Sequence, residues 1–476
     1  MSPFDAARYA RLLEGLSVAE VSLSGLEFSG RLDAEYYQPE YLRAEELIAT
    51  RSTVPLSRVA DFLIGPFGSA FTVENYCAAP TYRYIRGKDV KPMSIVEDDN
   101  VYMPKADYDR LAKYALKAGD VLVSVVGTIG NSALVEPQHV PAIFSCKSTA
   151  VRTRAVDPRY LIAFLNCRYG RSLLIRKERG AIQKGLNLDD LKTLSVFVAG
   201  HDLQTRIAEI HALAGQAKTA SKAALECAES SLLTSLHLRD WQAPEPLSYI
   251  RRSSDAFTSE RLDAQHFQPR YQALTDFIDA TGQGALLAEW LSENQRGRQP
   301  DYAEDGLPVV NSKHVLRGEV RLDDHNRSAS FGEDDLLIHQ GDVLMNGTGV
   351  GTIGRCAPYL HRGEAIPDNH VTVLRPKKGL DAVYLSVFLN SMAGQWQVEQ
   401  RLRGSSGQIE LYPNDIGQFR VWVAPANVQA KIRKSVEMSH EQRQRAGALL
   451  DAAQRAVEIA IEKGEAAALK YLEAFR

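Results

Sequence analysis

The sequence predicts a mixed α+β protein built from two similar halves, each a globular domain followed by a long helix. Three observations support this prediction. Short motifs occur twice in the same order, and two long segments have helical periodicity. The runs between them are short, rich in β-forming residues and punctuated by glycine and proline. A chain of 476 residues is long enough for two to four such domains.

The composition is typical of a soluble globular protein, with 45% hydrophobic and 24% charged residues. No apolar run approaches the ~20 residues of a membrane span, and we see no secretory signal, so we expect a cytoplasmic protein without membrane contact. The five cysteines are scattered, which argues against a zinc site or a disulfide framework. The net charge of −3 means that any contact with nucleic acid must come from local basic patches.

Seven short motifs recur in one order at offsets between 222 and 230 residues, which indicates a duplication. The matched pairs are residues 31–34 and 261–264 (both Arg-Leu-Asp-Ala), 84–90 and 309–315, 119–122 and 341–344 (both Gly-Asp-Val-Leu), 127–130 and 351–354 (both Gly-Thr-Ile-Gly), 164–166 and 388–390 (both Phe-Leu-Asn), 196–199 and 421–424, and Gln204 and Ile207 with Gln429 and Ile432.

Each half should contain the same elements in the same order, and together they fit a compact domain of ordinary size. We expect a helix over 35–49 (265–279 in the second half), strands over 121–126 and 150–154 (343–346 and 371–375), a helix over 158–178 (382–402), and a last strand over 194–198 (419–423). The predicted domains are residues 1–200 and 241–425, and the predicted long helices are 201–240 and 426–476.

The long helix over 202–238 has apolar residues mostly three and four positions apart, as when one helix packs along another. At ~1.5 Å per residue it would be about 50 Å long. We expect it to lie antiparallel to the helix over 427–475 as a coiled-coil-like spacer that holds two domains apart. B-DNA presents the same face every ~34–36 Å, so two diverged domains on such a spacer could read an asymmetric, two-part site.

The doubled order of motifs resembles the specificity subunit of type I restriction–modification systems over nearly the whole chain. The motifs are Arg-Leu-Asp-Ala followed by Tyr-Gln-Pro or Phe-Gln-Pro, the Gly-Pro-Phe-Gly-Ser segment at 65–69 with residues 82–90, and Gly-Asp-Val-Leu followed by Gly-Thr-Ile-Gly. A domain-ending strand that runs into a long helix completes each half. The second half departs at 295–299, where Gln-Arg-Gly-Arg-Gln replaces Gly-Pro-Phe-Gly-Ser.

The resemblance implies two pseudo-symmetric target-recognition domains that bind a bipartite double-stranded DNA site, separated by two antiparallel helices. It implies that the chain has no catalytic residues and holds no cofactor. Two modification subunits, which methylate adenine N6 with S-adenosylmethionine, would dock on the helices. Motor–nuclease restriction subunits would join them, giving a complex that acts in phage defence.

Basic and polar residues near glycines are the candidates for DNA contact, because Arg and Lys bind phosphates and Gln, Asn and Arg read base edges. Cations at a helix C-terminus, solvated loop charge and ordinary loop residues are the alternatives. In the first half the candidates are Phe67, Ser69, Arg83, Arg86, Lys88, Lys147, Arg176, Lys177, Arg179, Gln183, Lys184 and Asn187. In the second half they are Arg296, Arg298, Asn311, Lys313, His314, His370, Arg401, Arg403, Ser405 and Gln408.

Motifs for other functions are weak or missing. Residues 349–354 match Gly-x-Gly-x-x-Gly, but no helix pattern follows, so we expect a turn and no dinucleotide site. The sequence contains no P-loop and no adenine-methyltransferase motif, and its histidines lack metal-ligand spacing. Two other functions stay open: an enzyme with an unrecognised site, and a protein-interaction scaffold without a DNA role.

Overall fold

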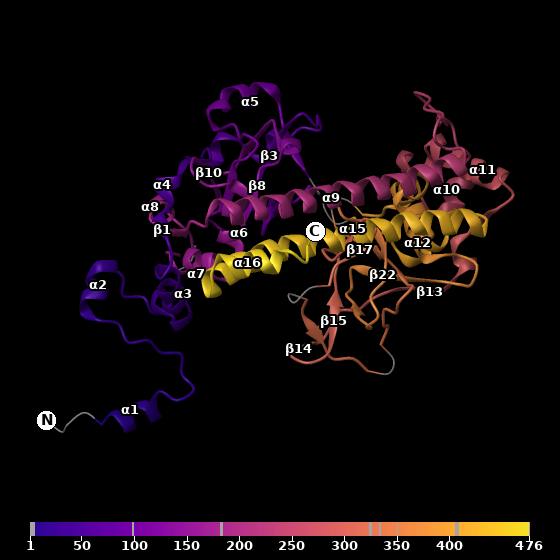
Figure 1. Cartoon of the computed structure of the whole chain (residues 1–476). Helices are drawn as coiled ribbons and strands as arrows, with labels where there is room; N and C mark the ends of the chain where they lie inside the picture. The colour runs from indigo at the N-terminus through magenta and orange to yellow at the C-terminus, as the bar shows by residue number, and fades with distance from the viewer. Residues whose placement is uncertain are drawn as a thin grey trace. The chain divides into compact units, whose positions relative to one another are not determined.

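The computed structural model describes residues 5–97, 100–180, 184–322, 326–332, 335–349, 351–404 and 409–475. These residues form two compact units. The first unit comprises Met1–Gln216 and Arg445–Arg476, and the second comprises Ala217–Gln444. Helices and short strands are mixed in both units (Figure 1), as the sequence predicts.

The first unit is built on an antiparallel four-stranded sheet in the order β2-β10-β7-β8. Its central strand β7 is buried at all four residues, which explains why the sequence there is continuously apolar rather than alternating. A second sheet places β3 between antiparallel β6 and parallel β9, and β1 pairs with β11. The strands are β1 Thr53–Pro55, β2 Ala60–Ile64, β3 Tyr82–Ile85, β4 Val90–Lys91, β5 Ser94–Ile95, β6 Val101–Met103, β7 Val121–Ser124, β8 Ser132–Leu134, β9 Ala142–Phe144, β10 Ser148–Thr153 and β11 Ser195–Phe197.

The second unit has a four-stranded sheet in the matching order β13-β22-β19-β20. Strand β15 again has one antiparallel neighbour, β18, and one parallel neighbour, β21, while β12 pairs with β23. The strands are β12 Gly284–Leu286, β13 Leu291–Arg296, β14 Tyr302–Ala303, β15 Leu307–Val310, β16 Val315–Leu316, β17 Glu319–Val320, β18 Ser328–Ala329, β19 Val343–Asn346, β20 Cys356–Pro358, β21 Ile366–Pro367, β22 Val371–Pro376 and β23 Arg420–Trp422.

The helices also occur at matching places in the two units. In the first unit they are α1 Ala6–Leu12, α2 Leu23–Ser29, α3 Pro39–Ala49, α4 Leu56–Val59, α5 Lys105–Arg110, α6 Pro158–Asn166, α7 Arg168–Arg176, α8 Leu188–Lys192 and α16 Glu465–Leu472. In the second unit they are α10 Ser253–Ser259, α11 Pro269–Ala280, α12 Ala382–Asn390, α13 Met392–Arg401 and α14 Pro413–Gly417. The long helices α9 His201–Ser235 and α15 Ala426–Lys463 contribute residues to both units.

The asparagine that ends the first helix after the sheet is buried in the first unit and half-buried in the second, and it makes the same bonds in both. In the first unit the Asn166 side chain accepts from the Ser132 N–H (3.3 Å) and donates to the Ser132 carbonyl (2.7 Å). In the second unit Asn390 bonds Cys356 in the same way, at 3.2 and 2.7 Å. One amide therefore satisfies both backbone groups of an edge-strand residue, which fixes each helix on its sheet.

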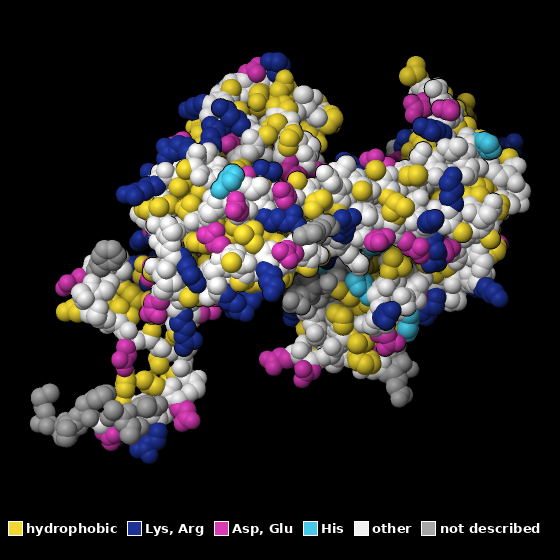
Figure 2. Space-filling model, in the orientation of Figure 1, with side chains coloured by type: hydrophobic (Ala, Val, Ile, Leu, Met, Phe, Trp, Pro, Cys, Tyr) yellow, Lys and Arg dark blue, Asp and Glu magenta, His cyan; other side chains and the backbone are white. Residues whose placement is uncertain are grey.

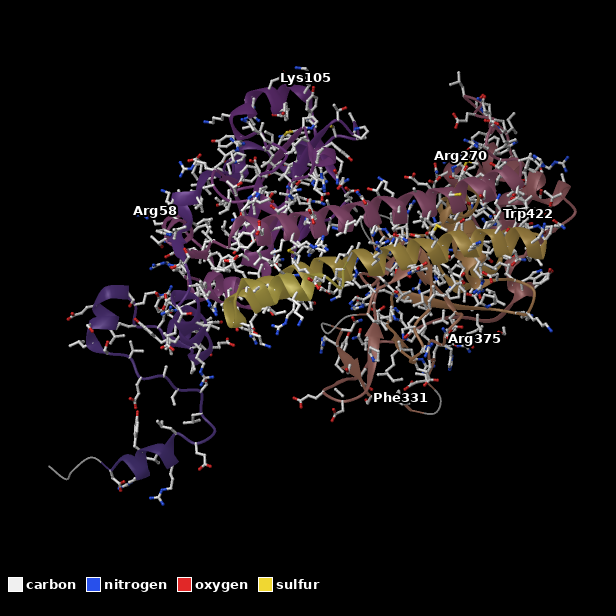
Figure 3. The ribbon with its side chains drawn as sticks, in the orientation of Figure 1. Arg58, Lys105, Arg270, Phe331, Arg375 and Trp422 are labelled. Carbon is white, nitrogen blue, oxygen red and sulfur yellow. The ribbon has the colours of Figure 1, made fainter. Side chains whose placement is uncertain are left out.

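An Arg–Asp fork across the central sheet also recurs. Arg152 on β10 donates to both carboxylate oxygens of Asp120, at 2.9 and 3.1 Å. Arg375 on β22, labelled in Figure 3, does the same to Asp342 at 2.8 and 2.9 Å. Both aspartates are almost fully buried and belong to the Gly-Asp-Val-Leu motif, so this motif has a structural role.

Two of the predicted helices are divided in the structure. The helix predicted over 158–178 is broken at Cys167, whose extended ψ of 160° ends α6 before α7 begins. The helix predicted over 382–402 is broken at Ser391, with ψ of 171°. After each break a glycine lies very close to the preceding helix: a Cβ on Gly170 would be 1.9 Å from the Phe164 carbonyl oxygen. The prediction of single helices was therefore wrong, because it followed apolar periodicity and not this tight turn.

The helix predicted over 35–49 begins later than expected. Gln38 is extended (ψ 135°), because the residue before a proline is excluded from the helical region, and α3 begins at Pro39. The same holds for Gln268 and Pro269 in the second unit. In both units a short 3₁₀ turn precedes the proline.

The long helices contribute to the core of each unit. In the first unit Ile207 and Ala214 of α9 share a core with Ala453 and Val457 of α15. In the second unit Ala228 and Leu232 of α9 share a core with Ile432 and Val436 of α15.

The single helix predicted over 427–475 was wrong, because Gly464 interrupts it. With φ at +96°, Gly464 ends α15 and lets α16 begin in a new direction. The Glu465 carboxylate at the start of α16 then accepts the Gly200 N–H (3.0 and 3.1 Å), next to the first turn of α9. The C-terminal segment is therefore part of the first unit.

Candidate nucleic-acid interface

Four loops of the first unit meet at one end of the strands of its central sheet, a place that we call its edge. The loop after β2 passes so close to the turn after β9 that a Cβ on Gly65 would lie 2.5 Å from the Ser145 carbonyl oxygen. In that turn, the Lys147 carbonyl accepts the Val125 N–H (2.9 Å) from the loop after β7. The Val125 carbonyl in turn accepts the Leu186 N–H (2.9 Å) from the loop before α8. These contacts bring together sequence segments as far apart as Gly65 and Leu186, which are separated by 121 positions (186 − 65).

Exposed polar and aromatic side chains line these loops. Phe67 is 84% exposed, far more than an aromatic ring in a core. A Cβ on Gly87 would lie 2.8 Å from the Lys147 Cβ, so the segment that carries Lys88 lies against Lys147. We call the exposed set the first-unit edge: Phe67, Ser69, Lys88, Lys147 and Lys184.

Three arginines predicted to contact DNA are used within the first unit instead. Arg83 is buried on β3 and donates to the Val96 carbonyl, and burial lowers its pKa. Arg176 is also buried, donating to the Tyr36 carbonyl at 2.9 Å and to a glutamate carboxylate. The Arg86 guanidinium donates to the carboxylate of Asp89, three residues further along the chain (2.9 Å). We leave these three out of the proposed DNA surface, because burial or intramolecular bonds occupy their guanidinium groups.

Other candidates of the first unit hold the loop before α8. Lys177 donates to the Thr193 hydroxyl (3.2 Å), and burial lowers its pKa. Arg179 donates to both oxygens of Asp190, at 2.7 and 2.9 Å. The Asn187 side chain accepts the Asp190 N–H (2.7 Å) and caps α8. The candidate Gln183 lies outside the described residues.

The second unit builds the same edge from different residues. A Cβ on Gly297, after β13, would lie 2.2 Å from the Pro367 carbonyl oxygen. The His370 carbonyl accepts the Gly347 N–H (2.8 Å), and the Gly347 carbonyl accepts the Leu411 N–H (2.9 Å). Gly297 therefore occupies the place of Gly65, although the sequence around it lacks Gly-Pro-Phe-Gly-Ser.

The exposed side chains here include Arg298, Lys313 and His370. The His370 Nδ1 is 2.7 Å from the Thr348 hydroxyl, a residue that the sequence reasoning missed. The position of Thr348, shortly after the end of a strand and beside a glycine, could have indicated this residue. We call these four residues the second-unit edge: Arg298, Lys313, Thr348 and His370.

Arg296 lies deeper than predicted. It donates to the Leu411 carbonyl, forms an ion pair with Glu410 (3.4 Å), and its guanidinium carbon lies 5.2 Å from the centre of the Tyr412 ring. It thus anchors the loop before α14 to β13, and we leave it out of the proposed DNA surface.

Asn311 and His314, also predicted to contact DNA, form a turn instead. The Asn311 N–H donates to His314 Nδ1 (3.2 Å), as the Arg86 N–H donates to the Asp89 carboxylate (2.9 Å) in the first unit. His314 is buried in this turn. The two pairs are therefore two ways to cap one turn.

The two arginines after α13 are engaged as well. Burial lowers the pKa of the Arg401 guanidinium to about 10, and it donates to the Gln400 side chain (2.7 Å). Arg403 donates to both oxygens of Asp415, at 3.0 and 2.9 Å. The candidates Ser405 and Gln408 lie outside the described residues.

The Gly-x-Gly-x-x-Gly segment forms turns, as predicted. Gly349, Gly351 and Gly354 all have positive φ, and β20 rather than a helix follows them. A helix N-terminus to hold a phosphate is therefore missing after this motif.

Within the described parts of the chain, His, Cys, Asp and Glu side chains form no group that could hold a metal ion. The described helices also include none that is long and apolar enough to cross a membrane.

On the face seen in Figure 2, Lys and Arg side chains alternate with Asp and Glu over both units and form no continuous basic stripe. This distribution agrees with the slightly negative net charge. On this face, basic side chains therefore occur only in small local sets.

Comparisons with known proteins agree with the resemblance seen in the sequence. No protein-family model matches the chain. The chain is 23% identical over 397 residues to the type I restriction enzyme EcoKI specificity subunit of Escherichia coli (strain K12), covering 80% of each chain.

Among solved structures it is similar to a type I restriction-modification S subunit from M. genitalium (13% identity, TM-score 0.37, 88% of this chain and 95% of that chain). It is also similar to the HsdS subunit from Thermoanaerobacter tengcongensis (14% identity, TM-score 0.26, 88% and 96%). The chain thus resembles type I specificity subunits, and the resemblance drawn from the doubled motifs is confirmed.

Proposed function

We propose that this chain is the DNA-sequence specificity subunit of a type I restriction–modification complex. One observation carries the proposal: both units present an edge with the same backbone contacts, and most of the exposed side chains on the two edges differ. A shared scaffold with diverged surface residues suits two domains that bind the same kind of polymer at two different sequences. The first-unit edge offers lysines for phosphates and Phe67 for apolar contact with bases, and the second-unit edge offers Arg298, Lys313 and His370.

The proposed organisation follows the predicted boundaries. Residues 1–200 and 241–425 are the target-recognition domains, and 201–240 and 426–476 are spacer helices in an antiparallel coiled-coil arrangement. The core contacts support this. The first half of α9 packs with the second half of α15 in the first unit, and the reverse holds in the second unit. We propose that the domains read the two parts of a bipartite, asymmetric site in double-stranded DNA.

The partners of the chain are part of the proposal. Two modification subunits bind the spacer helices and carry adenine methylation with S-adenosylmethionine, so the chain itself needs no catalytic residue and no cofactor. Motor–nuclease subunits join them for restriction in the cytoplasm, in defence against phage. The similarity to the EcoKI specificity subunit of E. coli supports this role.

The test is co-expression of the chain with candidate methyltransferase subunits, followed by mapping of methylated adenines in the host DNA. We expect one bipartite motif with a fixed gap, and no methylation when the chain is left out. Retention of no methyltransferase subunit, with salt-independent behaviour towards duplex DNA, would favour a protein-interaction scaffold. A stoichiometric S-adenosylmethionine site on the isolated chain would favour an enzyme.

A further inference from the structure

Beside its edge, each unit has a second Arg–Asp fork, distinct from the one across the central sheet. The two forks lie at matching positions. In the first unit Arg179 donates through Nε and Nη2 to the Asp190 carboxylate, at 2.7 and 2.9 Å. In the second unit Arg403 donates through the same atoms to Asp415, at 3.0 and 2.9 Å. Two parallel N–H···O bonds fix the orientation of both groups, which a single contact does not.

A pair of backbone hydrogen bonds made by the same arginine accompanies each fork. Arg179 and Gly185 exchange two N–H···O bonds, at 2.9 and 2.8 Å. Arg403 and Glu410 exchange two bonds at the same distances. The arginine is thus held twice, through its backbone to Gly185 or Glu410 and through its side chain to the following helix.

The aspartates are the firmly held partners. Asp190 lies in α8 and only 6% of its surface is exposed, while Asp415 lies in α14. Their helices are anchored in the core through Leu191 and Ile416, which are buried. The segments before these helices contact the edges, because the N–H groups of Leu186 and Leu411 donate to the carbonyls of Val125 and Gly347. Each fork therefore connects an anchored helix to a loop that borders the proposed DNA surface.

From this geometry we infer that Asp190 and Asp415 are positioning residues for DNA reading, each for one part of the bipartite site. They act through Arg179 and Arg403, which tie the loops and do not bind phosphates. The inference rests on the proposed function and deepens it. It also revises the sequence-based expectation that these two arginines contact DNA.

The salt dependence of binding separates this role from phosphate binding. A cation that binds a DNA phosphate contributes ~0.9 to the slope of log affinity against log salt concentration. An arginine already neutralised by a carboxylate contributes little to that slope. Arg179→Ala should therefore leave the slope unchanged but lower the discrimination against mismatched bases in one part of the site, by roughly tenfold. Arg403→Ala should do the same for the other part.

The experiment uses the complex of the full chain with its modification subunits and duplexes that carry the mapped site. Binding is measured over a salt series for the cognate duplex and for single mismatches in either part. We expect Arg179→Ala, Asp190→Asn and their double variant to lose discrimination equally, because one fork is lost in each. Lys147→Ala, which removes an exposed cation of the first-unit edge, is the control and should lower the slope while keeping discrimination.

A slope reduced by about one phosphate contact in Arg179→Ala would overturn the inference, as would an equal loss in both parts of the site. If Arg179→Ala lowers the melting temperature of the chain, Arg179→Lys keeps the ion pair without the fork. It should still lose discrimination in one part only, and full discrimination in this variant would contradict the positioning role. If the wild-type complex methylates no bipartite site, the proposed function fails, and that result differs from any of these.

Discussion

The two units share a set of internal bonds at matching positions and differ in most of the side chains that they expose at their edges. The sheet orders, the asparagine bonds, the Arg–Asp forks and the loop closures recur in both. Most of the exposed side chains at the edges do not recur: Lys147 stands where the second unit has His370, and Pro66 follows Gly65 where Arg298 follows Gly297. Lys88 and Lys313 are a matching pair. The comparison shows that repeated motifs such as Gly-Asp-Val-Leu and Phe-Leu-Asn maintain a scaffold. Under the proposed function, specificity would reside in the edge side chains that differ between the units.

The largest expected effect comes from breaking the shared scaffold in one unit. Asn166→Ala removes the side-chain partner of the buried Ser132 N–H, while the Ser132 carbonyl keeps its bond from the Met93 N–H, so the change should cost roughly 2–3 kcal/mol of unfolding free energy. Hydrogen exchange followed by mass spectrometry should show the loss in the first unit. Asn390→Ala is the matched variant and should act on the second unit. Equal protection loss throughout the chain in both variants would contradict the view of two separate cores.

A second change tests the glycine that separates α15 from α16, a break that has no counterpart within α9. Gly464, between α15 and α16, has φ of +96° and ψ of 161°, which is accessible almost only to glycine. Gly464→Ala should lower the unfolding free energy by about 1–3 kcal/mol, because its cost is backbone strain rather than a clash. Chemical denaturation measures this loss. Gly215→Ala within α9, where a Cβ also meets open space, is the control and should stabilise the chain slightly. A Gly464→Ala chain as stable as the wild type would show that the break is not needed.

A third change exchanges one exposed position between the edges. Lys147→His replaces a permanent cation by a group that is mostly uncharged above pH 8, so the salt slope of DNA binding should fall by about 0.9 at that pH. His370→Lys should raise it by a similar amount. Fluorescence anisotropy over a salt series measures both slopes. Unchanged slopes in both variants would remove these positions from the DNA surface.

The smallest expected effect concerns a polar pair between the long helices in the second unit. The hydroxyls of Ser221 and Ser439 are buried and 2.9 Å apart. Each single alanine variant should cost about 1 kcal/mol, because it leaves the other hydroxyl unpaired, and the double variant should cost less than the sum. Thermal unfolding of the three variants gives this coupling. Fully additive losses would show that the pair contributes no joint stabilisation.

The sequence predicted the order and type of most elements because the duplication doubled every signal. It failed where a local turn decided the structure. The apolar periodicity runs through Cys167 and Ser391, where the chain is extended for one residue. Gly464 could have been recognised as a helix breaker, since glycine is a poor helix former and common at helix ends.

The site residues were harder to predict, because charge alone does not tell whether an arginine is exposed. Arg83 and Arg176 are buried, and Arg179 and Arg403 are paired with aspartates 11 and 12 positions away. The pairing had a signal, since Arg179 and Asp190 recur at the same offset as the other motifs. The match of Gly65 with Gly297 had none, because only the contact with the neighbouring turn makes the two loops equivalent.

The most direct test of the account is a hybrid chain in which residues 31–200 are replaced by those of a specificity subunit with a different known target. Methylated adenines are then mapped in cells that express the hybrid with its modification subunits. The account predicts a new motif in which one part and its methylated adenine change, while the other part and the gap stay the same. A motif that changes in both parts, or in neither, would contradict the claim that each unit reads its own part of the site.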